Sequence, residues 1–213
     1  HEFRTPLGTL LSSLSILEKY VKPGSGSAEE KHINRIRSSV SHLVEILDDF
    51  LSLDKLENGK AEIQPVPFNV ESFIGSVVEE MQTLLKEGQK IEWNYKGEAE
   101  FRLDTRVLKN ILYNLLSNAI KFSGKGSGIT IHASATEHAL MIRVKDKGIG
   151  IPEADQPFMF MRLFRAKNAI NIGGTGLGLN IVKRYIELMN GEIGFISEEG
   201  KGAEFIVQLP LDK

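Results

Sequence analysis

Cysteine is absent from the 213-residue chain, and net charge and long apolar runs are also lacking. Without cysteine the chain can form no disulfide framework, thiolate nucleophile or cysteine-built zinc site. The 26 basic side chains are balanced by 28 acidic ones, which argues against nucleic-acid binding through bulk charge. No apolar run approaches the roughly 18 residues that a membrane-spanning helix needs, and no signal peptide opens the chain.

The residues that are present are typical of a globular protein. Hydrophobic residues make up 41% of the chain and charged residues 25%. The length allows one large domain or two small ones, with room for a sizeable core. The first residue is His1 rather than Met, and a helical pattern follows at once. We therefore expect a fragment whose upstream part is absent.

Apolar residues recur at alternating spacings of three and four in two segments near the start of the chain. The first set is Leu7, Leu10, Leu14, Leu17 and Val21, and the second is Ile33, Ile36, Val40, Leu43, Leu47 and Phe50. This heptad pattern predicts two helices, and the Pro-, Gly- and Ser-rich residues 22–27 predict a turn that makes them an antiparallel hairpin. Each helix has one narrow apolar seam, so a second hairpin would complete a four-helix bundle in a homodimer. Docking on a domain of the same chain is the alternative.

The helical pattern ends at residues 57–60, and Pro65 and Pro67 follow, which predicts two domains of residues 1–60 and 61–213. In the second domain we expect helices at 70–85, at 103–122 with Asp104 or Thr105 as N-cap, and at 177–189. Strands are expected at 89–95, 98–103, 129–135, 139–145, 192–197 and 203–209. This order predicts an α+β fold, in which an α/β sandwich has one mixed or antiparallel sheet with helices on one face.

A first polar cluster lies on the helix expected at 103–122. Asn114, Asn118 and Lys121 are spaced by four and three residues, so they project from one face while the neighbouring leucines serve the core. An amide oxygen is a hard, neutral ligand for Mg²⁺, and lysine supplies a point charge for phosphate. The face therefore suits a magnesium nucleotide, and an ordinary solvated helix face is the alternative.

A second cluster, Asp146-Lys-Gly-Ile-Gly-Ile-Pro, directly follows an expected strand. Gly148 and Gly150 let the backbone approach a flat ring closely. The carboxylate can accept a hydrogen bond from an exocyclic amine, which favours adenine over guanine. A simple hairpin turn is the alternative, because Asp and Gly are common turn residues.

The third cluster is the glycine-rich run 173–179, which leads into a helix. Backbone N–H groups at a helix N-terminus form a phosphate cradle, although no Gly-Lys-Ser/Thr of a Walker loop and no Rossmann unit surround this run. Between the second and third clusters, residues 157–168 interleave apolar side chains with Arg and Lys. That segment predicts a lid over phosphates or an amphipathic core helix followed by a loop.

The chain opens with His1-Glu2-Phe3-Arg4-Thr5. Imidazole is a good nucleophile near neutral pH, and a neighbouring carboxylate can orient it and accept its proton. Thr5 lies one helical turn further on and shares the face of His1. A solvated helix end is the alternative.

Together these residues resemble the sensor histidine kinases of two-component signalling, over nearly the whole chain. Residues 1–7 look like the family's phosphoacceptor box. The runs 114–122, 146–150, 160–165 and 174–178 look like its N, G1, F and G2 boxes, in the family's order, and 200–205 resembles a further glycine turn. The resemblance implies a dimeric helical domain followed by an ATP-binding domain of the kind shared with gyrase, mismatch-repair ATPases and a heat-shock chaperone.

The resemblance also implies roles for individual residues. His1 would be phosphorylated with Glu2 as base, and Thr5 would help position a water that dephosphorylates the partner regulator. Asn118 would hold Mg²⁺, and Asp146 would bind the adenine amine. The other nucleotide-binding residues would be Asn114, Lys121, Phe122, Gly148, Gly150, Ile151, Arg165, Gly174, Thr175, Gly176, Leu177, Gly178 and Leu179. The F box departs from the family pattern, because Met161 replaces a common acidic residue and Leu163 a common Phe.

The leading hypothesis is ATP-dependent phosphorylation of His1 followed by transfer to an aspartate of a response-regulator receiver domain. An ATP-hydrolysing clamp of the same fold is one alternative, but such relatives place a Glu four residues before the Mg-binding Asn, where this chain has Asn114. A non-catalytic dimeric scaffold is another. The expected partners are a second copy and a receiver domain, with no nucleic acid. The fragment is expected in the cytoplasm, and upstream segments are the candidates for an inner-membrane anchor.

Overall fold

The computed structural model describes residues 4–18, 20, 28–57 and 62–211. The chain divides into two compact units, His1–Lys55 and Leu56–Lys213. Each unit has its own arrangement of helices or strands.

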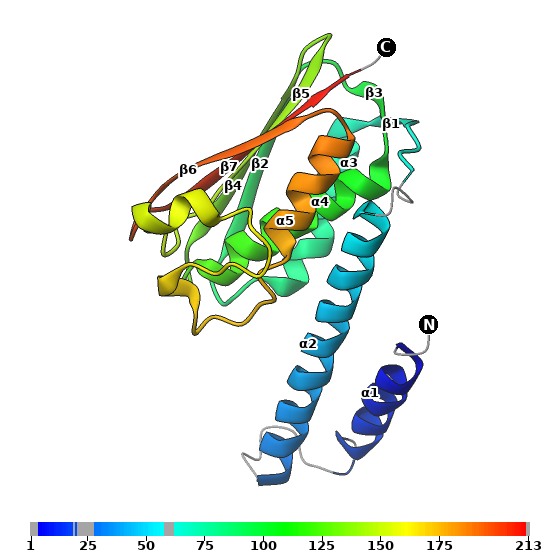
Figure 1. Cartoon of the computed structure of the whole chain (residues 1–213), viewed down its shortest axis with the longest axis vertical. Helices are drawn as coiled ribbons and strands as arrows, with labels where there is room; N and C mark the ends of the chain where they lie inside the picture. Colours follow the sequence, from blue (N-terminus) through cyan, green and yellow to red (C-terminus); the bar gives the residue numbers. More distant parts are fainter. Residues whose placement is uncertain (1–3, 19, 21–27, 58–61, 212–213) are drawn as a thin grey trace. The chain divides into compact units, whose positions relative to one another are not determined.

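The first unit contains the helices α1 (Arg4–Glu18) and α2 (Ala28–Glu57) (Figure 1). Among the heptad positions, Leu14, Ile33 and Val40 are buried, as an apolar seam requires. Several other seam positions are about half exposed or more. We call this set the open seam: Leu10, Leu17, Ile36, Leu43 and Phe50. The predicted seam residue Val21 lies outside the described residues. No helix in the described ranges is both long and apolar enough to cross a membrane.

The second unit is built on a five-stranded sheet in the order β2-β4-β5-β7-β6. Its strands are β2 (Lys90–Lys96), β4 (Gly128–Ala135), β5 (Ala139–Lys145), β6 (Glu192–Glu198) and β7 (Gly202–Pro210). Strand β2 is parallel to β4, and all other neighbours are antiparallel. Of the two kinds of sheet that the sequence allowed, mixed or antiparallel, the structure has the mixed one.

A separate two-stranded antiparallel ladder joins β1 (Val66–Asn69) to β3 (Glu100–Leu103). The sequence did not predict β1, because Pro67 weakens the strand signal. A proline is tolerated in a short edge strand, where its missing N–H is not needed by a second neighbour.

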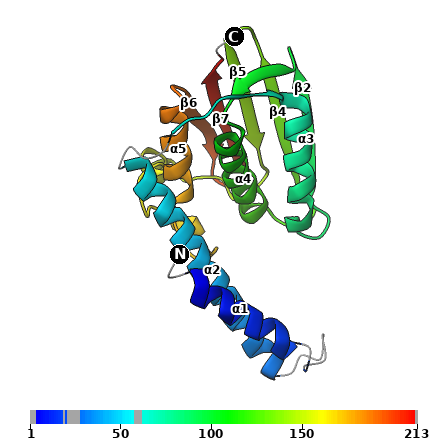
Figure 2. The ribbon, with the colours of Figure 1, turned by 90° about the vertical axis from the view of Figure 1, so that its right-hand side faces the viewer.

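Three helices cover one face of the large sheet: α3 (Val70–Met81), α4 (Thr105–Phe122) and α5 (Gly178–Leu188) (Figures 1 and 2). Helix α3 is shorter than predicted, because residues 82–84 tighten into the 3₁₀ turn η1 (Gln82–Leu84). Asp104 is the N-cap of α4, and its side chain accepts hydrogen bonds from the backbone N–H groups of Arg106 and Val107. The helix therefore begins where the sequence predicted.

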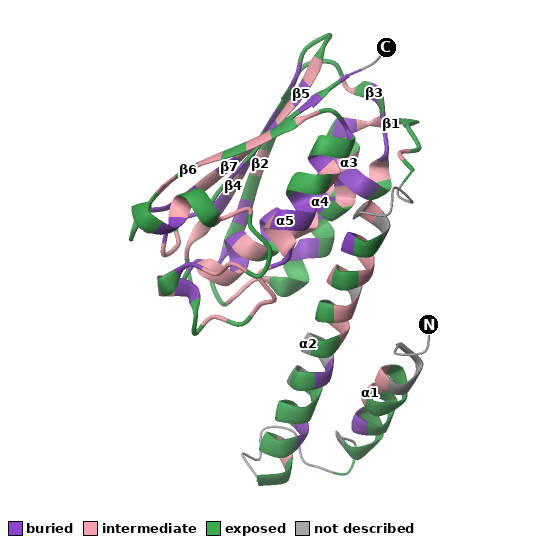
Figure 3. Ribbon diagram, in the orientation of Figure 1, coloured by how far each residue is buried: buried purple, intermediate pink, exposed green. Residues whose placement is uncertain are grey.

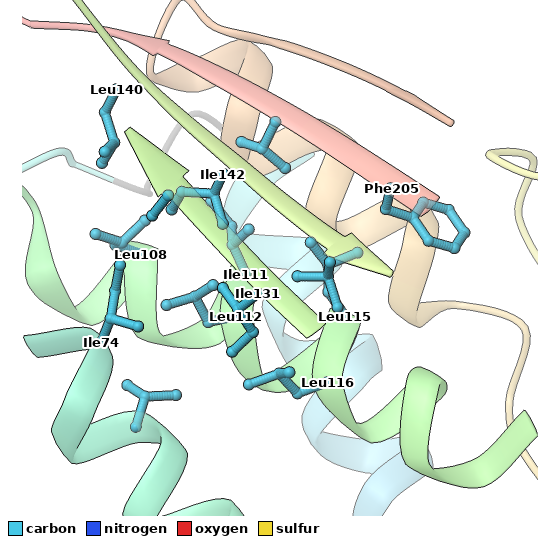
Figure 4. Close-up of a cluster of buried hydrophobic side chains, with 14 of the residues drawn as sticks. Ile74, Leu108, Ile111, Leu112, Leu115, Leu116, Ile131, Leu140, Ile142 and Phe205 are labelled. Atoms are coloured by element: carbon cyan, nitrogen blue, oxygen red, sulfur yellow. The ribbon is translucent and has the colours of Figure 1, made fainter. Parts of the chain in front are cut away.

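The core lies between these helices and the sheet, and burial follows the helix and strand periods (Figure 3). Ile74 of α3 and a row of α4 side chains meet residues from the strands (Figure 4). The α4 residues Leu108, Ile111, Leu112, Leu115 and Leu116 are almost completely buried. Because the apolar side of α4 packs into the core, its polar side faces away from the core and its side chains are available to bind a ligand.

The segment of residues 157–168 contains no α-helix, so the amphipathic core helix considered for it is wrong. Short 3₁₀ turns stand at its ends, η2 (Glu153–Phe158) and η3 (Lys167–Ala169). Between them, Leu163 has a positive φ of 59°, which an α-helix does not allow, and it is 70% exposed. Pro157 also disfavours a continuous helix here.

Candidate functional site

The polar side of α4 is where the predicted nucleotide-binding residues begin to converge. Asn114, Asn118 and Lys121 are half-buried, in contrast to the buried leucines on the other side. The amide nitrogen of Asn114 donates to the carbonyl oxygen of Asn110 at 3.0 Å. A β-carbon at Gly178 would lie only 2.6 Å from Asn114 Oδ1, so the first residue of α5 lies directly against this side of α4.

The glycine-rich loop before α5 contacts the same helix. Gly174 has a φ of 141°, and a β-carbon there would collide with the Nζ atom of Lys121. Gly176 has a φ of 74°, and a β-carbon there would lie 2.8 Å from the backbone carbon of Leu163. Thr175 Oγ1 accepts a hydrogen bond from the N–H of Leu177 at 3.1 Å. The loop thus passes between α4 and the 157–168 segment, where a side chain would fill the space.

Asp146 is buried at the end of β5 and is held by backbone groups. Its Oδ1 atom accepts from the N–H of Gly148 at 2.8 Å and from the N–H of Ala203 at 3.3 Å. Among the described residues, no hydrogen bond reaches Oδ2. Burial raises the pKa of Asp146, and the two backbone hydrogen bonds oppose that shift only in part. The carboxylate is therefore fixed in position by one oxygen and has the other oxygen open to a donor.

The loop that follows Asp146 lies against the C-terminal end of α4. The N–H of Ile149 donates to the carbonyl oxygen of Phe122 at 3.2 Å, and a β-carbon at Gly148 would lie 2.5 Å from that oxygen. On the other side of the loop, the N–H of the buried Ile151 donates to Ser197 Oγ at 2.9 Å. All three sequence clusters therefore meet around α4, although they are far apart in the chain.

Two residues that the sequence did not single out hold the C-terminal end of α4. Lys86 Nζ donates to the carbonyl oxygens of Lys121 and Ser123, both at 2.6 Å. The buried Gln89 side chain donates to the carbonyl oxygens of Ile120 and Gly124 at 3.1 and 3.0 Å. These bonds satisfy carbonyls that a helix end leaves without partners. No local sequence signal identifies either residue, because each partner is more than 30 positions away.

Other predicted residues lie elsewhere or outside the described part. One guanidinium nitrogen of Arg165 donates to the carbonyl oxygens of Ala169, Ile170 and Ile172, so this residue shapes its own loop. Leu177 is buried, and Leu179 packs against the core. His1 and Glu2 lie outside the described residues. Thr5 is in α1, and its side chain is outside the description.

The arrangement of these residues agrees with the two protein families that the chain matches. Residues 103–213 match the family described as histidine kinase-, DNA gyrase B-, and HSP90-like ATPase. Residues 1–59 match the His Kinase A (phospho-acceptor) domain. The chain belongs to the sensor histidine kinases. The order of a phosphoacceptor helical region and an ATPase domain is the order that the sequence predicted for this family.

Individual histidine kinases resemble this one over its whole length. The circadian input-output histidine kinase CikA of Synechococcus elongatus is 32% identical over 99% of this chain and 29% of its own length. The signal transduction histidine-protein kinase BarA of Escherichia coli K12 is 33% identical over 100% of this chain and 24% of its own length. This chain therefore spans less than a third of these relatives.

Solved structures show the same fold. Full-length ShkA in complex with AMPPNP is 29% identical, with a TM-score of 0.80, over 100% of this chain and 44% of that chain. Histidine kinase ThkA in complex with the response regulator protein TrrA has a TM-score of 0.67 at 23% identity, over 100% of this chain and 59% of that chain.

Proposed function

We propose that this chain transfers the terminal phosphoryl group of ATP to His1 and then to an aspartate of a response-regulator receiver domain. The observation that carries the proposal is the meeting of Asn118, Asp146 and the 173–178 loop around α4. In this proposal Asp146 binds the base, the 173–178 loop binds the phosphates, and Asn118 binds Mg²⁺. The AMPPNP complex of ShkA supports an adenine nucleotide as the ligand.

The base end of the site fits adenine. Asp146 presents an open carboxylate oxygen, which accepts hydrogen bonds and donates none. The exocyclic amine of adenine is a suitable donor, whereas the carbonyl of guanine would meet a second acceptor. Gly148 lets the loop after Asp146 lie close to α4, which leaves a backbone surface for a flat ring.

The phosphate end of the site fits a charged group. The N–H groups at the start of α5 follow the glycine-rich loop, and a helix N-terminus favours an anion. Lys121 brings a positive charge against Gly174. Asn118 is the proposed Mg²⁺ ligand, because an amide oxygen is a neutral oxygen donor of the kind that Mg²⁺ accepts. Bound Mg²⁺ would supply positive charge to neutralise the phosphate oxygens.

In the proposed reaction, an imidazole nitrogen of His1 forms a bond to the terminal phosphorus, and the bond from that phosphorus to the ADP oxygen breaks. Glu2 accepts the imidazole proton. The phosphoryl group then passes from His1 to the receiver carboxylate: the bond from phosphorus to the imidazole nitrogen breaks, a bond to a carboxylate oxygen forms, and Glu2 returns the proton, which restores the neutral imidazole. The work of the protein is mainly to position the two reactants and balance charge, as phosphoryl transfer requires. In this proposal Thr5 positions a water that removes the phosphoryl group from the regulator.

An ATP-hydrolysing clamp has less support from the site. Its water-activating base would stand four residues before Asn118, at Asn114. An amide is not a base, and the amide nitrogen of Asn114 is already bonded to the carbonyl of Asn110. The open seam of the first unit supports a homodimer, because its exposed apolar side chains would be covered by a second hairpin.

The proposal is tested by incubating the chain with Mg²⁺ and terminally labelled ATP. An acid-labile label is expected on the wild type and is expected to be lost in His1→Gln. The matched control is His32→Gln, which makes the same change at an exposed histidine of α2 and should keep the label. A label that survives His1→Gln, or steady ATP turnover without any phosphoprotein, would contradict the proposal. Addition of the cognate receiver domain should then remove the label from the wild type.

A further inference from the structure

Asn168 lies at the far end of the 157–168 segment and contacts the loop that follows Asp146. Its Nδ2 atom donates to the carbonyl oxygen of Gly150 at 3.1 Å and approaches that of Ile149 at 3.4 Å. Only an NH₂ group can face two carbonyl oxygens, so the orientation of this amide is fixed by chemistry. Asn168 belongs neither to the heptad pattern nor to the family boxes.

The turn that carries Asn168 is anchored at three successive residues. The N–H of Lys167 donates to the buried Asp155 carboxylate at 2.8 Å. Asn168 binds the Gly150 loop, and the carbonyl oxygen of Ala169 accepts from Arg165 at 2.7 Å. Ala169 is itself buried. The backbone that carries the Asn168 amide is therefore held in place by hydrogen bonds on both sides of this residue.

The loop that Asn168 binds is the proposed adenine surface. Ile149 is tied to α4 through Phe122 on one side, and its carbonyl oxygen accepts from the N–H of Gly200 at 2.8 Å. Among the described residues, the side chain of Asn168 is the hydrogen-bond donor to the carbonyl oxygen of Gly150. Loss of its side chain would free that carbonyl while the rest of the loop keeps its bonds.

The Oδ1 atom of Asn168 is buried without a hydrogen-bond partner among the residues that the structure describes. A buried acceptor in a native protein normally has a donor, and an exception calls for an explanation. Within the described part of the chain, Ser123 Oγ and Asn180 Oδ1 are buried without a partner in the same way, so the unpaired Oδ1 does not by itself mark a ligand contact, and the inference rests on Nδ2.

We infer that Asn168 is a positioning residue for adenine, which fixes the Gly150 loop through Nδ2 and couples it to the 157–168 segment. The inference rests on the proposed nucleotide site. Asn168 acts at the base end of the nucleotide, so its loss weakens every ligand that carries adenine by the same factor. Ligand phosphates do not alter that factor.

The test compares Asn168→Ala with Asn171→Ala, which makes the same change at an exposed asparagine three residues further along. Dissociation constants are measured for Mg-AMPPNP by calorimetry and for adenosine by competition, together with the melting temperature of the nucleotide-free chain. Asn168→Ala is expected to weaken both ligands by roughly three- to tenfold, the range for one lost hydrogen bond, and to lower the melting temperature by no more than a few degrees, because the Gly150 carbonyl loses a donor in the nucleotide-free chain as well. Asn171→Ala should bind both ligands like the wild type.

The outcomes separate the inference from the proposed function. Failure of the wild type to bind Mg-AMPPNP would overturn both. Normal binding by Asn168→Ala would overturn the inference alone. Loss of Mg-AMPPNP binding with adenosine unaffected would place the role of Asn168 at the phosphates, and this too would overturn it. A lowered melting temperature with unchanged affinities would leave Asn168 a purely structural residue, against the inference.

Discussion

At the scale of single residues, Asp146 meets two opposed requirements. The carboxylate is buried, which disfavours its charged form and raises its pKa. The proposed role in binding the adenine amine needs an acceptor at that same position. A residue that costs stability in the empty site and contributes only when ligand is bound is common in functional sites.

The variant Asp146→Asn separates these effects. A group with a raised folded-state pKa favours the fold while it is protonated, below its ordinary pKa of about 4, and that contribution is lost as the pH rises through the raised value. The nucleotide-free variant should therefore melt at the same temperature as the wild type or higher at pH 7. The difference should shrink as the pH falls toward 4. Thermal melts across this pH range measure the effect.

Nucleotide binding should change in the opposite direction. The amide that replaces the carboxylate in Asp146→Asn would present an NH₂ group to the adenine amine, so two donors would face each other. The affinity for Mg-AMPPNP should fall by at least about tenfold, in line with about 1.5–3 kcal/mol for a charged hydrogen bond. Calorimetric titration provides the measurement. A variant that is clearly less stable than the wild type at pH 7, or that binds equally well, would contradict this account of Asp146.

At the scale of elements, α4 is held at both ends while its two sides serve different purposes. Asp104 caps the first turn and also accepts from the backbone N–H of Gln64 at 2.8 Å. Lys86 and Gln89 satisfy the last carbonyls. The helix is therefore fixed in length and position, which places Asn118 and Lys121 relative to the Asp146 loop.

Removal of the cap should weaken the second unit. Burial alone would raise the pKa of Asp104, but hydrogen bonds from Arg106 and from the backbone of Gln64 and Val107 outweigh it, so the pKa is lowered. Asp104→Ala should reduce the free energy of unfolding by about 1–2 kcal/mol, measured by urea denaturation at pH 7. Asp104→Asn is the matched control, because Asn is also a good cap, and it should lose less.

The pH dependence isolates the charge. Stability from a carboxylate with a lowered pKa is present above its ordinary value of about 4 and is lost as the pH falls through the lowered value. The advantage of the wild type over Asp104→Asn should therefore begin to shrink near pH 4 and disappear only below the lowered pKa of Asp104. An advantage that persists unchanged in acid would show that the charge of Asp104 has no part in it.

Elements with a strong local signal were predictable from the sequence, and those defined by distant contacts were not. The periodicity of α4 gave both its buried leucines and its polar side, and Asp104 marked its start. The early end of α3 and the strand β1 were not predicted. The local sequence signal is weak at both places, and packing against the rest of the unit determines the structure there. Lys86, Gln89 and Asn168 act through backbone carbonyls of distant segments, which leave no pattern in the sequence.

At the scale of the whole molecule, the two units differ in how completely they bury their apolar side chains. The second unit closes its core between three helices and the sheet. The first keeps the open seam, in which Leu43 is 52% exposed and Phe50 is 62% exposed. Contiguous exposed apolar side chains are typical of association surfaces.

A charge placed in the open seam should therefore dissociate the proposed dimer. Leu43→Glu is expected to be a monomer at concentrations at which the wild type is a dimer, as measured by sedimentation or light scattering. The control is Ile196→Glu, a similar change at a 65% exposed residue of β6, which should remain a dimer. A wild type that stays monomeric at high micromolar concentration would refute the dimer.

The parallel pairing of β2 with β4 also bears on the order in which the second unit assembles. The pairs β4–β5 and β6–β7 are hairpins of consecutive strands, whereas β2 reaches β4 only after β3 and α4 have intervened, joining Lys90 to Gly128. Closing the longer loop costs more chain entropy, and such non-local pairings slow folding. The only tryptophan of the chain, Trp93, lies on β2 against Gly75 of α3. Its fluorescence therefore reports the closure of this edge of the sheet, while circular dichroism follows the helices.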